Sequence, residues 1–354
     1  MISNKINAYW AITKTGITGG TLSIKGQYKT TDVIGNERNL SGYYFDGTDW
    51  SSGGETHDTI LHRISAPITS SSGVLLAMNQ FIAVGSRAFL QGAYNSTTGL
   101  MSDSLRSGGN GINIIPLSDP YRSAPYNTSF FHVNNTATET AASTVFANKT
   151  AINDNIVDWV FLELRNTNSS PGNTILQTRS ALIQRDGDIV DIDGVSPVTF
   201  NNFPLGNYVL SVRHRNHLGI SLNPITGAKM FTEKSTLAFT TNVADFRTSA
   251  LLFGTSSSYS SAFHPTLTSV RLLWGGNANM NSNVKYIGLQ NDKDFIFIKT
   301  LNTNPTTILN NTYSPADLNM NKIVRYSGIN NDKDFLFSTV LGSSSIAQRI
   351  QTLP

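Results

Sequence analysis

Oxygen-bearing side chains recur at every second position in a short segment near the C-terminus. Asp317, Asn319 and Asn321 occupy positions one, three and five of a D-x-N-x-N pattern. Alternating carboxylate and amide oxygens are the ligands of an EF-hand calcium loop. Position twelve of such a loop is Glu, where this chain has glycine, so we expect the later Asp332 and Asp334 to close a longer loop. The alternative is a turn held by hydrogen bonds from the same Asx side chains.

The same pattern occurs once more, earlier in the chain. Residues 277–297 and 317–337 share N-M-N, [KR]-Y-x-G and N-D-K-D-F at an offset of 40 residues (317 minus 277). Agreement of this length predicts two equivalent units that pack as a pair, each with a polar loop followed by a short apolar helix or strand. Asn277 replaces the first aspartate, so we expect weaker calcium binding in this copy. The corresponding ligands are Asn277, Asn279, Asn281, Asp292 and Asp294.

Four aspartates lie close together in the middle of the chain: Asp186, Asp188, Asp191 and Asp193. Carboxylates this close repel one another unless they point apart or share a cation. Strand alternation would place Asp191 and Asp193 on one face, where a calcium ion or an arginine could hold them. The alternative, which we prefer, is a solvated hairpin turn.

The run RHRNH (213–217) combines arginines with two histidines, His214 and His217. Histidines three residues apart could bind a metal, but no carboxylate motif accompanies them. We therefore favour a structural role, in which these cations pair with the aspartate cluster across a hairpin.

The loops and turns that carry these residues must be positioned by β-strands. In the stretch 158–220, Tyr208, Leu210 and Val212 alternate with their neighbours, which is typical of a half-buried strand. Short strands in series, without helical segments between them, predict an all-β protein built from antiparallel β-sandwiches. We expect three regions: an N-terminal β-sandwich (1–85), a central β-sandwich with a long wrapping loop (86–263), and a two-copy repeat domain (264–354).

Turn residues predict two hairpins in the first region. Residues 8–16 and 21–29 are strand-like and flank the Gly-Gly turn at 17–20. A second tight turn is expected at residues 46–47, which are Asp-Gly.

The composition excludes several classes of function. Only 14% of the 354 residues are charged, and the net charge is +3. The basic residues are scattered, which argues against a nucleic-acid partner. The chain has no cysteine, so disulfides and thiolate metal sites are excluded. We find no nucleophile elbow, P-loop, dinucleotide fingerprint or zincin helix.

Apolar runs are short throughout the chain. None approaches the roughly 20 residues of a membrane span, so we expect none. The N-terminal residues lack the apolar core of a signal peptide. We therefore expect either no export through this segment or a place within a longer exported chain.

Several long motifs resemble a known group of proteins. The runs DWVFLELRN, RSALIQRDGDIVDIDG and YVLSVRHRNHLG resemble the C-terminal regions of large secreted surface proteins of Bacteroidetes, described as hemagglutinin-like or adhesin-like. The repeat DLNMN…VRYSGINNDKD resembles their dockerin-like tail, and the central stretch is similar to transthyretin-like stalk modules. The resemblance implies export by the type IX route and a role at the cell surface or in an appendage.

Three functions compete at this stage. The first is a non-enzymatic extracellular structural subunit or stalk that associates with itself or with other surface-protein modules. The second is a carbohydrate-binding adhesin, for which exposed aromatics and Asn-rich loops are the motivation. The third is a hydrolase with paired carboxylates, because the distance between two carboxylates in the folded protein cannot be determined from the sequence.

Overall fold

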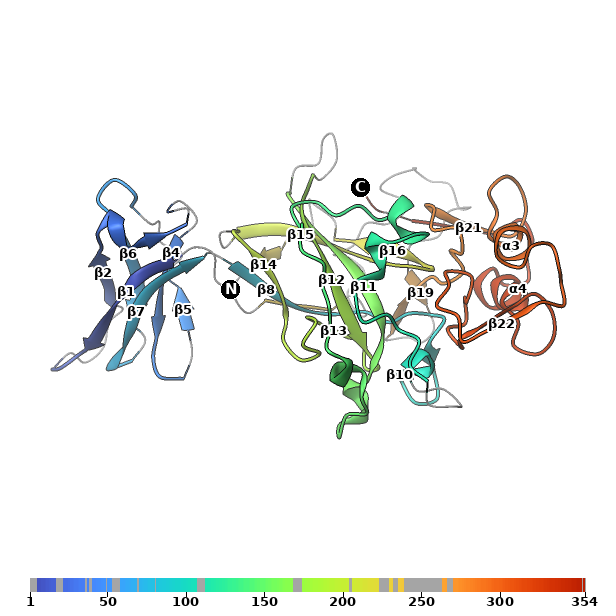
Figure 1. Ribbon diagram of the computed structural model, residues 1–354, viewed down its shortest axis with the longest axis horizontal. Helices are drawn as coiled ribbons and strands as arrows, with labels where there is room; N and C mark the ends of the chain where they lie inside the picture. Colours follow the sequence, from blue (N-terminus) through green and yellow to red (C-terminus); the bar gives the residue numbers. More distant parts are fainter. Residues whose placement is uncertain are drawn as a thin grey trace. The chain divides into compact units, whose positions relative to one another are not determined.

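The computed structural model describes residues 5–16, 22–35, 37, 40–48, 50–52, 58–68, 70–79, 81–106, 112–167, 174–203, 206–222, 229–231, 235–238, 263–265, 270–351 and 353. Its regular secondary structure is mostly antiparallel strand, and its helices are few and short (Figure 1). The prediction of an all-β protein is therefore confirmed. Contacts divide the chain into two compact units: unit 1, which comprises Met1–Ala83, Thr199–Gly206 and Phe231–Glu233, and unit 2, which comprises Val84–Val198, Asn207–Met230 and Lys234–Pro354.

Unit 1 contains two antiparallel sheets with an apolar core. The larger sheet has the strand order β3-β1-β7-β4-β5, and the smaller one pairs β2 with β6. Leu40, Tyr44 and Leu75 are fully buried and pack with Tyr28 and Ile64 in the core. The elements are β1 (Lys5–Thr13), β2 (Leu22–Gln27), the 3-10 turn η1 (Thr30–Asp32), β3 (Val33–Ile34), β4 (Leu40–Phe45), β5 (Trp50–Ser52), β6 (Arg63–Ile68) and β7 (Ser72–Asn79).

The first predicted hairpin is wrong, whereas the second is confirmed. β1 pairs with β7 and β3, and β2 pairs with β6 in the other sheet, so β1 and β2 are not partners. The expected Gly-Gly turn lies outside the described residues. Pairing follows which faces are buried together, and a glycine-rich connection permits a change of sheet as readily as a tight turn. At the second site Phe45 pairs with Trp50 across the expected turn.

The largest sheet of unit 2 places β8, β13, β12, β11, β15 and β16 side by side in this order. Every residue of β11 is buried. Val209 and Ser211 of β15 are also fully buried, so the prediction of a half-buried strand is wrong there, because other segments cover the second face. β9 pairs with β10, and β19 pairs with β20, in two separate small sheets. The strands from residue 81 to residue 273 are β8 (Phe81–Arg87), β9 (Tyr94–Asn95), β10 (Leu100–Met101), β11 (Ile156–Arg165), β12 (Ile175–Gln184), β13 (Asp188–Val190), β14 (Val198–Asn201), β15 (Gly206–His214), β16 (His217–Ser221), β17 (Lys229–Phe231), β18 (Ser235–Ala238), β19 (Phe263–Pro265) and β20 (Arg271–Leu273).

A long segment between β10 and β11, residues 112–155, lies against β11 and β12; we call it the wrapping segment. Its Tyr121 hydroxyl donates to the carbonyl of Trp159 at 2.9 Å, and the Trp159 indole donates to the carbonyl of Pro116 at 2.8 Å. It forms 3-10 turns, and Pro120 and Pro125 lie at the starts of the first two. These turns are η3 (Pro120–Arg122), η4 (Tyr126–Thr128), η5 (Ser143–Phe146) and η6 (Ile152–Asp154).

The two repeat copies exchange strands. β21 of the first copy pairs with β24 of the second, and β22 pairs with β23. The helices α3 and α4 lie beside each other (Figure 1), and Tyr286 contacts Phe337 across the pair. The two copies therefore pack as a pair. Their elements are β21 (Asn283–Lys285), α3 (Asp292–Asp294), the π-helical turn η8 (Phe295–Thr300) and β22 (Ile308–Asn310), then β23 (Ile323–Arg325), α4 (Asp332–Asp334), η9 (Phe335–Val340) and β24 (Gln348–Ile350).

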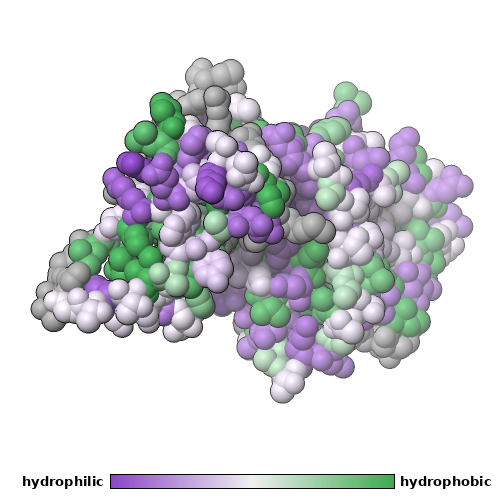
Figure 2. Space-filling model, turned by 60° about the vertical axis from the view of Figure 1, so that its left-hand side comes forward, coloured by the Kyte–Doolittle hydropathy of each residue, from purple (hydrophilic) through white to green (hydrophobic). Residues whose placement is uncertain are grey.

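Apolar residues at the surface form small groups between hydrophilic ones on the face drawn in Figure 2. Within the described ranges, none of the helices combines the length and apolar character that crossing a membrane requires.

Candidate functional site

Two buried carboxylates hold the loop of the second repeat. Asp317 and Asp332 are both fully buried. Asp317 accepts hydrogen bonds from the backbone N–H groups of Asn321 and Lys322, each at 3.0 Å. Asp332 accepts two more backbone N–H groups of the same loop, at 2.8 and 2.9 Å. All four carboxylate oxygens therefore fasten loop backbone, as expected of an Asx-stabilised turn.

Two asparagines of this loop converge on one carbonyl oxygen. Asn319 Nδ2 donates to the carbonyl of Asn330 at 2.9 Å, and Asn321 Nδ2 lies 3.5 Å from the same oxygen. Asn331 caps α4, because its Oδ1 accepts the N–H of Asp334 at 2.8 Å. Four of the predicted ligands therefore lie in one loop, while Asp334 lies at its exposed edge.

The first repeat has the same arrangement with one change. Asp292 is fully buried and accepts the backbone N–H of Lys285 at 2.9 Å. Asn277 stands where the second copy has Asp317, and its Nδ2 donates to a carbonyl four residues further on at 2.8 Å. The remaining predicted ligands of this copy lie at positions equivalent to those of the second: Asn279, Asn281 and Asp294.

Burial changes the acidity of these carboxyl groups. It raises the pKa of Asp317 to about 6, although the positive charge of Arg215 opposes the change. It also raises the pKa of Asp332 well above its ordinary value, and the adjacent Asp317 adds to the effect. The pKa of Asp292 is raised to about 8 by burial, against the opposing effect of its N–H donors. A proton or a cation would relieve the cost of these buried charges.

Calcium binding to the two loops stays a prediction. The side chains are of the types that Ca²⁺ prefers, but their carboxylate oxygens already accept backbone N–H groups, with which an ion would compete. One observation favours an ion: the Oδ1 atoms of Asn277 and Asn319 are buried and have no hydrogen-bond partner in the part of the chain that the structure describes.

Each repeat also forms a pocket at the same place. The pocket volumes are about 410 Å³ in the first copy and about 620 Å³ in the second. Planar amides, a carboxylate and an aromatic ring together can bind a ligand rich in hydroxyl groups. The shared lining of the first copy, with counterparts 40 residues later, is Asn279, Asn281, Asn291, Asp294 and Phe295.

The central aspartates have separate protein partners. β13 ends at Val190, so Asp191 and Asp193 lie in a turn and the alternative of one strand face is wrong. The preferred interpretation of a hairpin turn holds for Asp186, between the paired strands β12 and β13; Asp188 lies on β13, and the turn after β13 leads to β14, which is not its partner. Each carboxylate has its own partner: the N–H of Asp188 for Asp186, Arg87 for Asp188, Arg179 for Asp191 and the N–H of Ser196 for Asp193.

The cations of the run 213–217 bind β11 and do not bind the aspartate cluster, so that predicted pairing is wrong. Arg213 binds Glu163 at 3.1 Å. Arg215 Nε and His214 Nε2 lie 2.8 and 3.1 Å from one oxygen of Asp158. The physical reason is sheet order: β15 neighbours β11, whereas most of the aspartate cluster lies at β13, beyond β12.

His214 and His217 form a hydrogen-bonded chain that ends at Asp158. His217 Nε2 accepts the backbone N–H of Gly92 at 3.0 Å, which places the His217 proton on Nδ1. His217 Nδ1 lies 2.7 Å from Asn216 Oδ1 and 3.0 Å from His214 Nδ1, so both acceptors face its N–H, and His214 donates from Nε2 to Asp158. Burial lowers both histidine pKa values, that of His217 the further, which favours these neutral rings. A metal bound by this pair would displace these hydrogen bonds.

The same cluster fastens the central sheet to the repeat pair, and we call it the junction. The Tyr313 hydroxyl donates to Asp158 at 2.6 Å. Arg215 lies over the Tyr313 ring at 4.6 Å and donates to the carbonyl of Ser314. Asn216 Nδ2 donates to a carbonyl of the second repeat loop at 2.6 Å. Because Asp158 and Arg215 are fully buried, these bonds form away from water.

A glycine permits the close approach that the junction requires. A β-carbon at Gly92 would lie 2.3 Å from the carbonyl oxygen of Leu318. The neighbouring Gln91 accepts the N–H of Gly275 at 2.9 Å through its side-chain oxygen. The loop after β8 therefore packs directly on the repeat region.

Sequence reasoning missed the junction residues Asp158 and Tyr313. An available signal was an aspartate near the start of a largely apolar strand, which must find a partner once it is buried. It also missed the pocket residues Asn291 and Phe295, although the repeat motif N-D-K-D-F contains both. Comparison of the chain with protein-family models, with curated proteins and with solved structures finds no match.

Proposed function

We propose that the chain is a non-enzymatic structural or stalk module of an extracellular cell-surface appendage or filament. The observation that carries this proposal is the junction. A stalk must pass mechanical load from one module to the next. Hydrogen bonds and an ion pair that are shielded from water resist such load better than exposed contacts, because solvent does not compete for their partners.

A stalk or filament also needs surfaces for its neighbours, either further copies or other surface-protein modules. Leu289 and Ile329 occupy equivalent positions in the two repeats and are 89% and 81% exposed. Large aliphatic side chains at the tips of both loops suit contact with a neighbouring subunit. The resemblance to secreted Bacteroidetes surface proteins supports an extracellular location and type IX export.

Electron microscopy and sedimentation velocity over a range of protein concentrations test self-association. We expect ordered polymers or oligomers for the wild-type chain, and a shift towards monomer for the variant Leu289→Ser/Ile329→Ser. Ile152→Ser is a matched control, because Ile152 is also exposed (57%) but lies outside the repeats. A wild-type chain that stays monomeric at high concentration, and that also binds no other surface protein, would contradict the proposal.

Glycan binding is a second candidate function, which the paired pockets favour. Two equivalent pockets would bind two units of one polysaccharide, and linked weak sites raise the apparent affinity. A glycan array with and without calcium tests this candidate, with Asp294→Asn/Asp334→Asn as the pocket variant and Asp154→Asn as an exposed control. The absence of binding to any glycan would refute it.

A further inference from the structure

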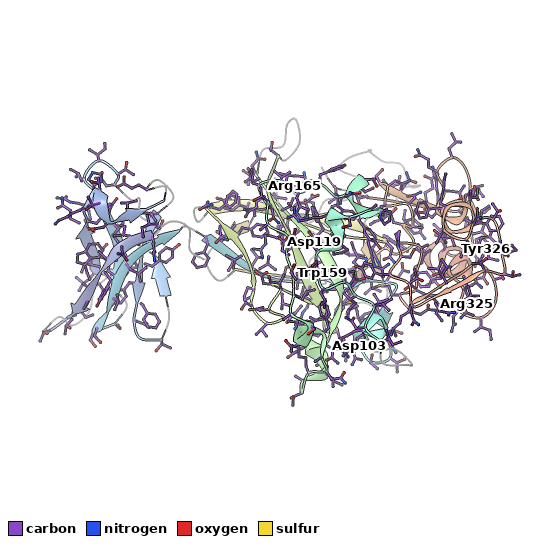
Figure 3. All side chains as sticks on the ribbon, viewed as in Figure 1. Asp103, Asp119, Trp159, Arg165, Arg325 and Tyr326 are labelled. Atoms are coloured by element: carbon purple, nitrogen blue, oxygen red, sulfur yellow. The ribbon has the colours of Figure 1, made fainter. Side chains whose placement is uncertain are left out.

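Three side chains that are distant from the repeat loops meet in the wrapping segment and bring metal-ligand atoms together. One ligand atom of each of Asp119, His132 and Glu139 lies within 4.8 Å of the other two. Figure 3 shows Asp119 close to Trp159 of the central sheet. Asp119 and Glu139 are 3% and 7% exposed, so the two carboxylates are buried.

One polar atom of each of these side chains is held by a hydrogen bond outside the cluster. Asp119 Oδ1 accepts the backbone N–H of Tyr121 at 2.9 Å. His132 Nδ1 lies 3.1 Å from Thr178 Oγ1 on β12. Glu139 Oε1 accepts Asn135 Nδ2 at 2.6 Å and further donors from β12. Anchoring of this kind orients metal ligands in known sites, because the bond at one ring nitrogen fixes the tautomer and aims the other nitrogen.

The second polar atom of each side chain lacks a well-oriented hydrogen bond within the described residues. Asp119 Oδ2, His132 Nε2 and Glu139 Oε2 are buried, and among the described residues none has a hydrogen-bond partner of acceptable geometry. His132 Nε2 lies 2.8 Å from Asp119 Oδ2, and Arg122 Nε lies 3.2 Å from the same oxygen at an unfavourable angle. Arg122 Nη2 donates to two backbone carbonyls, at 3.0 and 2.6 Å, and also lies 3.5 Å from Glu139 Oε2. Three buried ligand atoms therefore face one point, with their other atoms bound elsewhere.

We propose that Asp119, His132 and Glu139 form a binding site for one divalent transition-metal ion, with Zn²⁺ as the best match. One imidazole nitrogen and two carboxylate oxygens suit Zn²⁺, whereas Ca²⁺ prefers oxygen ligands alone. Two carboxylates balance the charge of a divalent ion, and water supplies the remaining ligand. The occupant that competes with the metal is the Arg122 guanidinium, which lies beside both carboxylates.

The ion would tie irregular parts of the wrapping segment to one another. The three ligands lie at residues 119, 132 and 139, on a stretch whose regular structure is limited to short 3-10 turns. Such a stretch has little backbone hydrogen bonding of its own, so a metal bound only by the folded form stabilises it. The site is then structural, which agrees with a stalk module but does not depend on that function.

Isothermal titration of untagged, EDTA-treated full-length protein with ZnCl₂ tests the proposal. We expect about one ion per chain and a rise in the melting temperature of the protein. Glu139→Gln and His132→Ala should each weaken Zn²⁺ binding by about 100-fold or more. Glu37→Gln is the matched control, because Glu37 also contacts a histidine, His62, at 2.7 Å, and within the described residues this pair is not part of a cluster of three metal-ligand groups. We expect this variant to bind Zn²⁺ like the wild type.

A spectroscopic measurement on the wild-type chain covers the case in which a variant does not fold. X-ray absorption of the Zn²⁺ complex should show one histidine nitrogen with oxygen ligands at about 2.0–2.2 Å. A spectrum with two histidines would place the ion at His214 and His217 and overturn the proposal. The proposal also fails if the wild-type chain binds no Zn²⁺, Co²⁺ or Mn²⁺, which would leave Arg122 as the partner of the carboxylates.

Discussion

Asp158→Asn should destabilise unit 2 more than any other single isosteric change at the junction. One oxygen of Asp158 accepts Arg215 Nε and His214 Nε2, and the other accepts the Tyr313 hydroxyl. Arg215 is fully buried, and the carboxylate is the anion that its charge faces. The Arg215 charge, with the hydrogen bond from His214, holds the pKa of Asp158 below its usual range despite burial. Asparagine keeps the shape but removes the charge.

The magnitude follows from leaving one buried charge unpaired. Removal of one partner from a buried ion pair costs about 3–5 kcal/mol. The amide also presents an NH₂ group to donors, since Asn Oδ1 can serve either Tyr313 or Arg215 but not both. At about 2–4 °C per kcal/mol for a domain of this size, the melting temperature should fall by about 6–20 °C. Asp158→Asn/Arg215→Met should lose less than Asp158→Asn alone, because no buried charge is then left unpaired.

Urea titration gives the free energy of unfolding, and hydrogen exchange of peptides from β11 and β15 assigns the loss to unit 2. Asp154→Asn is the control, since Asp154 is exposed and neighbours the same strand. Equal stability of Asp158→Asn and Asp154→Asn would refute the reasoning. So would a double variant that is less stable than Asp158→Asn, because the ion pair would then not be the cause.

Three further predictions concern the junction and the repeat loop. Burial holds the pKa of His217 well below its ordinary value, so only the unfolded chain takes up a proton at this residue as the pH falls through about 6.5. Below that pH the wild type should lose up to about 1.4 kcal/mol of unfolding free energy per pH unit relative to His217→Gln, as measured by urea titration at several pH values. A parallel pH dependence in both proteins would contradict this. Calcium added to EDTA-treated protein should raise the melting temperature, and Asp317→Asn should reduce the rise; no rise in either protein would contradict calcium binding. Gly92→Ala should cost about 1–3 kcal/mol, because its β-carbon meets the Leu318 carbonyl oxygen, and a wild-type melting temperature would contradict the packing.

The features that could be predicted from the sequence depend on residues close together in the chain. Alternation at Tyr208, Leu210 and Val212 locates β15, and the Asp-Gly turn locates the β4–β5 hairpin. The 40-residue repeat predicts two equivalent units, because each copy carries the same turn and capping residues. The Asx residues of the repeats form their loops for the same reason, since an Asx side chain bonds backbone only a few residues away.

The features that could not be predicted join residues far apart in the chain. β1 pairs with β7 and passes over the nearer β2, and the sequence gives no local signal for this choice. Asp158 meets Arg215 across 57 residues and Tyr313 across 155. Spacing rules for metal sites apply to ligands on one helix or one tight loop, so they do not detect Asp119, His132 and Glu139 on an irregular segment.

Polar composition also misled the interpretation of the run RHRNH. Charged residues at a strand end usually lie in water, and the aspartate cluster was the nearest opposite charge in the sequence. In the structure these residues are almost all buried, because each finds a partner on β11 or in the repeat region: Glu163 for Arg213, Asp158 for Arg215 and His214. Charged groups can be buried only where neighbouring strands supply matching partners, and the mean hydropathy of a segment does not show whether such partners exist. A buried charged run of this kind therefore indicates a contact between parts of a fold, which here is the contact between the sheet and the repeats.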